Sequence, residues 1–247
     1  MKKAVGLLVL MIFILSISSS VNAQTVKVFT EDFSPYNYVN EDGEITGVST
    51  EIIREVFKEA GIETEIKVLP WARAYNMALN NDDIFIYSMM RTMKRENLFK
   101  WVVEVAPTES YLFKLKSRKN IKVDKLSDVR QYKVGAVRGD AGTQYLKDNG
   151  ITNLQLVSEN GLNIDKLLHK RVDLIEMDKA TLVYKIKSRR LDVNMIEPIY
   201  FNKEISGAQY LACNKNVSDA TIQKIQNAFN IVKKNGKYDE IINKWMK

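Results

Sequence analysis

Two arginines, Arg91 and Arg95, are the residues whose type and spacing best suit them to hold a ligand. They follow the apolar run 84–87, which is typical of the end of a buried strand. An arginine binds a carboxylate through two parallel charge-assisted hydrogen bonds, and Thr92 is placed to cap a short turn that aims Arg95. The pattern predicts an anion clamp at a strand terminus. The alternative is that both arginines are solvated surface charges.

The chain has the composition of an ordinary globular protein, with 247 residues of which 45% are hydrophobic and 27% charged. That length suffices for one large core or two small ones. Basic Lys2 and Lys3, an apolar stretch over 4–17 and a small-residue site at 21–23 predict a cleavable secretory signal peptide over 1–23. A membrane anchor is the alternative, but the apolar stretch is shorter than the ~20 residues that a span needs.

Charge and rare residues exclude several classes of function. The formal net charge of +7 falls by two when the signal peptide is removed, and the basic residues are interspersed with acids, so we expect no nucleic acid partner. Cys213 is the only cysteine, which rules out an internal disulfide. The single histidine, His169, supports neither a histidine-based metal site nor a Ser-His-Asp triad. We therefore expect no metal and no cofactor.

Strand and helix patterns alternate through the first part of the mature chain. Strands are predicted over 26–30, 65–69 and 84–87, and amphipathic helices over 50–60 and 71–79. Such alternation indicates crossover connections and a largely parallel sheet that is covered by helices.

A second alternating series begins after an extended aromatic segment near residue 111. Its predicted strands are 134–137, 154–157, 172–177 and 193–196, and its predicted helices are 143–147, 162–168 and 180–186. A strand over 208–212, an amphipathic helix over 219–234 and a final helix close the chain. Without a low-complexity linker, the two units would be joined by extended crossings near 109–116 and 203–207.

Five short segments stand in a characteristic order. They are Phe-Ser-Pro-Tyr at 33–36, Thr-Met-Lys-Arg-Glu at 92–96, Val-Gly-Ala-Val-Arg-Gly at 134–139, Val-Asp-Leu-Ile-Glu-Met-Asp at 172–178 and Asn-Gly-Lys-Tyr at 235–238. With them, essentially all of residues 24–247 resembles the bacterial extracellular solute-binding proteins, family 3, of the polar amino-acid type. Pro-Trp-Ala-Arg-Ala at 70–74 is similar to a divergent branch of that family.

The resemblance implies an α/β fold of the type II periplasmic binding class. Two lobes would be joined by two hinge strands, with a ligand cleft between them and closure by a hinge motion. Lobe 1 would comprise residues 24–108 and 206–247, and lobe 2 would comprise residues 109–205.

Family resemblance also assigns the charged ligand contacts. Arg95 matches the arginine of a Thr-x-x-Arg motif that grips an α-carboxylate, and Asp178 matches an acid that takes the α-amino group. The glycine turn from Gly139 to Thr143 would offer backbone amides and a hydroxyl to an anion at a helix N-terminus.

Aromatic residues would enclose the ligand from lobe 1. Phe33, Tyr36 and Trp71 stand at matching places, although Trp71 could instead be a core tryptophan that covers the sheet.

The chain departs from the family pattern just before the Thr-x-x-Arg motif. Ser88 and Met90 stand where the family usually has a glycine and a hydroxyl residue, and we include both in the expected site. Arg91 replaces a typical apolar residue, and Arg73 follows Trp71 closely enough to be a second cleft cation or part of a structural ion pair. With these extra cations in the cleft, the site would suit a ligand more anionic than an amino acid.

These features predict a monomeric periplasmic binding protein without catalytic activity. It would capture a small carboxylate-bearing solute, such as a polar amino acid, and pass it to an ABC-type permease. One alternative is a periplasmic dehydratase of cyclohexadienyl substrates (prephenate or arogenate), but the acids near the cleft, Glu31, Asp32 and Glu176, match no catalytic motif. Another is a ligand-sensing partner of a membrane receptor.

Overall fold

The computed structural model describes residues 25–246, and the predicted signal peptide lies outside them. The strands are β1 (Val26–Thr30), β2 (Tyr38–Val39), β3 (Ile45–Thr46), β4 (Thr64–Val68), β5 (Ile84–Met90), β6 (Lys100–Thr108), β7 (Ser110–Leu115), β8 (Val134–Val137), β9 (Leu154–Val157), β10 (Leu174–Asp178), β11 (Ile196–Phe201) and β12 (Gly207–Cys213).

Helices alternate with these strands. They are α1 (Val48–Glu59), α2 (Trp71–Asn80), α3 (Met93–Glu96), α4 (Ala141–Asp148), α5 (Asn160–Leu168), α6 (Lys179–Ser188), α7 (Asp219–Lys234) and α8 (Lys237–Met246), with the 3-10 turns η1 (Leu126–Gln131), η2 (Val193–Met195) and η3 (Lys203–Ile205). No helix within 25–246 combines the length and apolar composition that crossing a membrane requires.

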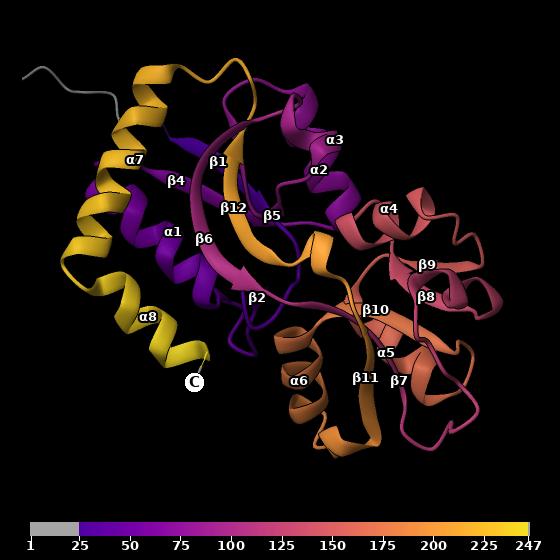
Figure 1. Cartoon of the computed structure of the whole chain (residues 1–247). Helices are drawn as coiled ribbons and strands as arrows, with labels where there is room; N and C mark the ends of the chain where they lie inside the picture. The colour runs from indigo at the N-terminus through magenta and orange to yellow at the C-terminus, as the bar shows by residue number, and fades with distance from the viewer. Residues whose placement is uncertain (1–24, 247) are drawn as a thin grey trace, which may run out of the picture.

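Two five-stranded sheets form the centres of two lobes (Figure 1). The first has the order β4-β1-β5-β12-β6 and the second the order β11-β7-β10-β8-β9. Parallel pairing joins β1 to β4 and β5, and β8 to β9 and β10. The remaining pairs, formed by the long strands that run toward the other lobe, are antiparallel.

The prediction of a largely parallel sheet is therefore right only for one half of each sheet. β12 in the first sheet and β7 in the second run opposite to the strands of the crossover units. β6 and β11 run in the same direction as those units, but each pairs only with an antiparallel neighbour, β12 or β7. The predicted strand over 193–196 is also wrong. Asp192 accepts a hydrogen bond from the Asn194 amide and starts the 3-10 turn η2, and the strand β11 follows it.

The chain passes between the lobes at two adjacent points. β6 leads into β7 through Glu109, and β11 returns to β12 through residues 202–206. Backbone and side chain bonds hold the two crossings together, because the Asn202 amide donates to the Ser110 carbonyl at 2.9 Å and the Ser110 amide donates to the Ser206 hydroxyl at 2.9 Å. Figure 1 shows both crossings side by side in the middle of the molecule.

Apolar side chains fill a layer on each face of both sheets. In the first lobe, α1, α7 and α8 pack on one face and α2 on the other. The second sheet is covered by α5 and α6 on one face and by α4 with η1 on the other. Helix α1 illustrates the cause, since its apolar positions Ile52, Ile53, Val56 and Phe57 recur at helical spacing and are all buried. Both sheets thus hold their strand ends rigidly where the lobes meet.

Gly47 fixes the loop that carries the aromatic residues of the first lobe. Its φ is 112°, and a β-carbon there would lie 2.4 Å from the Tyr36 carbonyl oxygen. The same loop is held by the Val48 amide, which donates to the Pro35 carbonyl at 3.0 Å. Only glycine fits this conformation and this close approach.

We predict that Gly47→Ala lowers the free energy of unfolding by about 2–4 kcal/mol, because backbone strain and a backbone clash add together. Gly43→Ala is the matched control, since Gly43 also has a positive φ, of 81°, but has no atom within 4 Å of the position of its missing β-carbon. It should cost only about 1–2 kcal/mol. Urea unfolding of both variants measures the difference, and equal losses would contradict the close-approach argument.

Candidate functional site

A cavity of about 70 Å³ lies where the two lobes meet. Its walls come from the carboxyl ends of parallel strands, which is where ligands bind in open α/β sheets. Glu31 follows β1, Ser88 and Met90 close β5, Asp140 follows β8, and Glu176 lies near the end of β10. The cavity is smaller than the roughly 300 Å³ of a typical ligand pocket, so the structure shows the lobes in a closed arrangement.

Three larger hollows, of about 580 to 680 Å³, lie elsewhere on the surface. One of them, the side groove between α3 and α4, is continuous in its lining with the cavity through Arg95. The small cavity nevertheless gathers the buried charged groups, which makes it the candidate site.

Arg95 is buried in the wall of the cavity and connects both lobes. Its Nη1 donates to the Met90 carbonyl at 3.2 Å and its Nη2 donates to the Gly139 carbonyl of the second lobe at 3.2 Å. The guanidinium also lies over the rings of Trp71 and Tyr75, 5.2 and 5.1 Å from their centroids. Burial lowers the pKa of Arg95, although an arginine stays charged in proteins.

The other two predicted cations lie away from the cavity. Arg91 forms a two-pronged ion pair with Glu96 and lies over the Trp101 ring, 5.4 Å from its centroid, with its side chain 43% exposed. Arg73 is exposed and borders a separate hollow beside Lys27. Among the described residues, Arg95 is therefore the only lysine or arginine that lines the cavity.

Four carboxyl groups share the cavity with this single cation. They belong to Glu31, Asp140, Glu176 and Asp178, and all four residues line the cavity. The sequence led us to expect extra cations in the cleft and therefore a more anionic ligand. The cavity instead has one cation and four acidic residues. Thr92 also lacks the predicted capping role, since its side chain makes no hydrogen bond to the first turn of α3.

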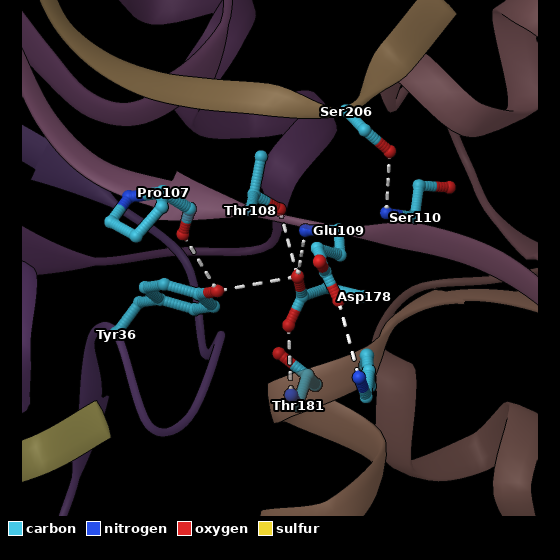
Figure 2. Close-up of polar contacts among 9 residues, drawn as sticks. Tyr36, Pro107, Thr108, Glu109, Ser110, Asp178, Thr181 and Ser206 are labelled. Atoms are coloured by element: carbon cyan, nitrogen blue, oxygen red, sulfur yellow. Dashed lines mark hydrogen bonds and ion pairs between the residues drawn. The ribbon is translucent and has the colours of Figure 1, made fainter. Parts of the chain in front are cut away.

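Asp178 lies at the predicted place, but its oxygens are engaged within the protein. Figure 2 shows Tyr36, Thr108 and the Glu109 amide converging on one of them, with distances of 3.2, 2.8 and 3.0 Å to Oδ2. Its Oδ1 accepts a bond from the Thr181 amide at 2.9 Å and thereby caps α6. Burial raises the pKa of Asp178, and these four hydrogen bonds oppose the rise.

The glycine turn contributes an acid to the cavity. Asp140 caps α4 by accepting from the Thr143 amide at 2.6 Å, and burial raises its pKa to about 6. The Thr143 hydroxyl donates to the Val137 carbonyl, so it is engaged by its own strand and does not line the cavity. The Gly139 carbonyl accepts from the Trp71 indole at 2.9 Å as well as from Arg95.

Glu31 and Glu176 are the acids whose roles family motifs do not assign. Burial, together with the charges of Asp140 and Asp32, raises the pKa of Glu31 to about 8, and Arg95 counteracts this. Burial and the charge of Asp140 raise the pKa of Glu176 to about 8. An acid inside the apolar run 172–177 is the sequence signal that could have identified Glu176.

Aromatic residues close the first-lobe side. Phe33 lines the cavity and stacks on Tyr36, with ring centroids 4.9 Å apart. The Tyr36 hydroxyl donates to the Pro107 carbonyl at 3.0 Å. Trp71 satisfies both sequence interpretations, because it lines the cavity and also packs in the core between α2 and the first sheet.

Ion pairs across the lobes hold the closed arrangement. Lys185 of α6 pairs with Asp32 at 2.7 Å, and Lys94 of α3 pairs with Asp148 of α4. The part of the chain that the structure describes has no group of three or more histidine, cysteine or acidic side chains arranged to bind a metal ion.

The two-sheet architecture with its double crossing and interlobe cavity defines a type II periplasmic binding fold. The family model for bacterial extracellular solute-binding proteins, family 3, matches residues 26–247. This chain belongs to that family.

Known proteins support the same assignment. A probable histidine-binding protein from Campylobacter jejuni subsp. jejuni serotype O:2 is 25% identical over 232 residues, which are 90% of this chain and 84% of that one. A histidine kinase sensor domain with similarity to periplasmic binding proteins superposes with a TM-score of 0.81 at 18% identity, covering 90% of this chain and 96% of the other. An ancestral arginine-binding protein bound to arginine superposes with a TM-score of 0.79 at 22% sequence identity, covering 90% of this chain and 98% of the other.

The raised pKa values predict that the ligand-free closed form is more stable in acid. Glu31 and Glu176, with a pKa of about 8 here and about 4.3 in an unfolded chain, bind more protons in the closed form. The stabilisation is thus complete below about pH 4 and is lost as the pH rises toward 8. The melting temperature of ligand-free protein should fall between pH 5 and 8, and Glu31→Gln should flatten that slope. A slope unchanged by Glu31→Gln would contradict the assignment.

Proposed function

We propose that this protein captures an amino acid of net positive charge in the periplasm by lobe closure and delivers it to an ABC-type permease. One observation carries the proposal, namely that four carboxyl groups, three of them buried and that of Asp140 half-buried, share the interlobe cavity with a single arginine.

The charge balance favours a ligand that brings more positive than negative charge. A buried ion is costly unless it is paired, so ionised cavity acids need cationic partners when the lobes close. A ligand carboxylate would neutralise Arg95, and its α-ammonium would compensate only one of the acids. A second cation on the side chain removes more of the remaining repulsion than a neutral side chain can. The name of one relative, an arginine-binding protein, agrees with this class. That of the other, a probable histidine-binding protein, agrees with it only for histidine whose imidazole is protonated.

The ligand contacts follow from which cavity atoms are free. We assign the ligand carboxylate to Arg95, with Phe33 and Trp71 enclosing the backbone of the amino acid and Ser88 and Met90 bordering it. The α-ammonium would lie between Asp178 and Glu31. Asp178 would exchange its bond from Tyr36 for the ligand, and the Glu31 carboxylate has no hydrogen-bond partner within residues 25–246.

Closure is part of the proposal because the cavity is too small to admit a solute directly. The lobes, which we divide at 24–108 with 206–247 and at 109–205, would separate by bending at the two crossings. Separation breaks the Trp71 and Arg95 bonds to Gly139 and the Lys185 pair with Asp32. Ligand cations would replace the protons that the closed, empty cavity requires, so binding and closure are coupled.

Export through the signal peptide, action as a monomer and a permease partner complete the proposal and rest on membership of the solute-binding family. A dehydratase activity and a sensing role remain the alternatives predicted from the sequence. Turnover of prephenate by the purified protein would identify the former.

We predict that L-arginine or L-lysine raises the melting temperature of the mature protein, whereas L-glutamate does not. A thermal-shift screen at pH 7.5 checks this, and an exclusive response to anionic or neutral solutes would contradict the proposal.

Arg95→Ala should weaken binding of the best of these amino acids at least about 100-fold, since a buried charged partner is lost. Arg73→Ala is the matched control, because it removes an exposed arginine of the neighbouring helix α2 and should leave affinity unchanged. Calorimetry measures both variants, and equal affinities for them would rule out the clamp.

A further inference from the structure

Glu176 is an acid in the middle of a fully buried strand. All five residues of β10 are buried, and Glu176 is only 5% exposed. The strand lies between β7 and β8, so its side chains are enclosed on both sides within the sheet. Because an acid in such a strand is costly to bury, its retention at the cavity wall calls for a partner charge.

The two oxygens of Glu176 have different surroundings. Oε1 accepts a hydrogen bond from the Ser110 hydroxyl at 2.6 Å. That hydroxyl in turn accepts a hydrogen bond from the side chain amide of Asn202 at 3.0 Å. Ser110 and Asn202 belong to the two crossings between the lobes. Oε2 makes no hydrogen bond within the described residues and lies against Gly142, where a β-carbon would be 1.9 Å away.

Glu176 and Arg95 line the same cavity but make contacts at different parts of its wall. Arg95 bonds the carbonyls of Met90 and Gly139, whereas Glu176 bonds Ser110 at the first crossing. A ligand whose carboxylate pairs with Arg95 would therefore extend its side chain toward Glu176. Lysine and arginine carry their second charge at that distal end.

We propose that Glu176 is a specificity-determining residue that binds the side chain cation of the ligand through its free Oε2. This assignment rests on the proposed function and deepens it, because it selects amino acids with a protonated guanidinium or ammonium at the end of the side chain. Ser110 is a positioning residue that holds Oε1 and links the occupied site to both crossings.

Gly142 provides an independent way to test the geometry. It lies in the first turn of α4 with an ordinary helical backbone, so alanine is tolerated by the main chain but displaces the Glu176 carboxylate. Gly161→Ala is the matched control in the first turn of α5, because its β-carbon would meet only the flexible end of Arg189, at 3.2 Å.

The experiment compares L-arginine with L-citrulline, which has nearly the same shape but an uncharged side chain. Isothermal titration calorimetry at pH 7.5 measures both ligands with the mature wild-type protein and with Glu176→Gln, Gly142→Ala and Gly161→Ala. Wild type should prefer arginine by about 10- to 100-fold, the value of one charge-assisted hydrogen bond. Glu176→Gln and Gly142→Ala should remove most of this preference by weakening arginine, with citrulline changed less than about 3-fold, and Gly161→Ala should retain it.

Each other outcome has a defined meaning. If Glu176→Gln weakens both ligands equally or neither, Glu176 is structural and the inference is wrong, while the proposed function stands. If wild type binds citrulline at least as well as arginine, the requirement for a second cation is wrong. If wild type binds neither these ligands nor lysine, the proposed function itself fails. The melting temperatures of the ligand-free variants show whether each one is folded.

Discussion

The removal from water of several negative charges around one positive charge is the constraint on which the closed structure depends. Arg95 is surrounded by two aromatic rings and two carbonyl groups. The carboxyl groups of Glu31 and Glu176 are buried in the same cavity where the lobes meet, and that of Asp140 is half-buried. Raised pKa values express the same constraint, since protons occupy the acids when no cation does. The lobes, their strand ends and the interlobe bonds bring these groups together in one cavity.

In the second lobe, two acids of the cavity also contact the segment that joins the lobes. Glu176 and Asp178 belong to one strand and hold the consecutive residues Thr108, Glu109 and Ser110, which form the first crossing. Any change in charge or position of these two acids therefore reaches the residues that join the lobes. The same side chains line the cavity and contact the first crossing, so no long pathway between the two is needed.

Sequence reasoning identified the family and both α/β units, because each leaves a local signal. It also predicted Arg95 as a ligand contact, and Arg95 lines the interlobe cavity. The positions of Arg73 and Arg91 depend on structural details that leave no local signal in the sequence. Arg91 precedes α3, so the helical spacing that would align it with Arg95 does not apply. Ser88 has a positive φ of 58°, and this bulge shifts the alternation of β5 so that Tyr87 faces one core and Met89 the other while Ser88 and Met90 border the cavity. Which acids turn inward followed from sheet register and lobe closure, which the sequence pattern does not encode locally.

The charge balance of the cavity also connects solute binding to the release of protons. Under the proposed function, an acid that is protonated in the empty closed form would release its proton when a ligand cation takes its place, so binding of the solute would be coupled to proton release. The apparent affinity is then a function of two concentrations, that of the solute and that of the proton. The apparent affinity for the solute would be lower in an acidic medium and higher in an alkaline one, although the contacts of the bound solute would be the same.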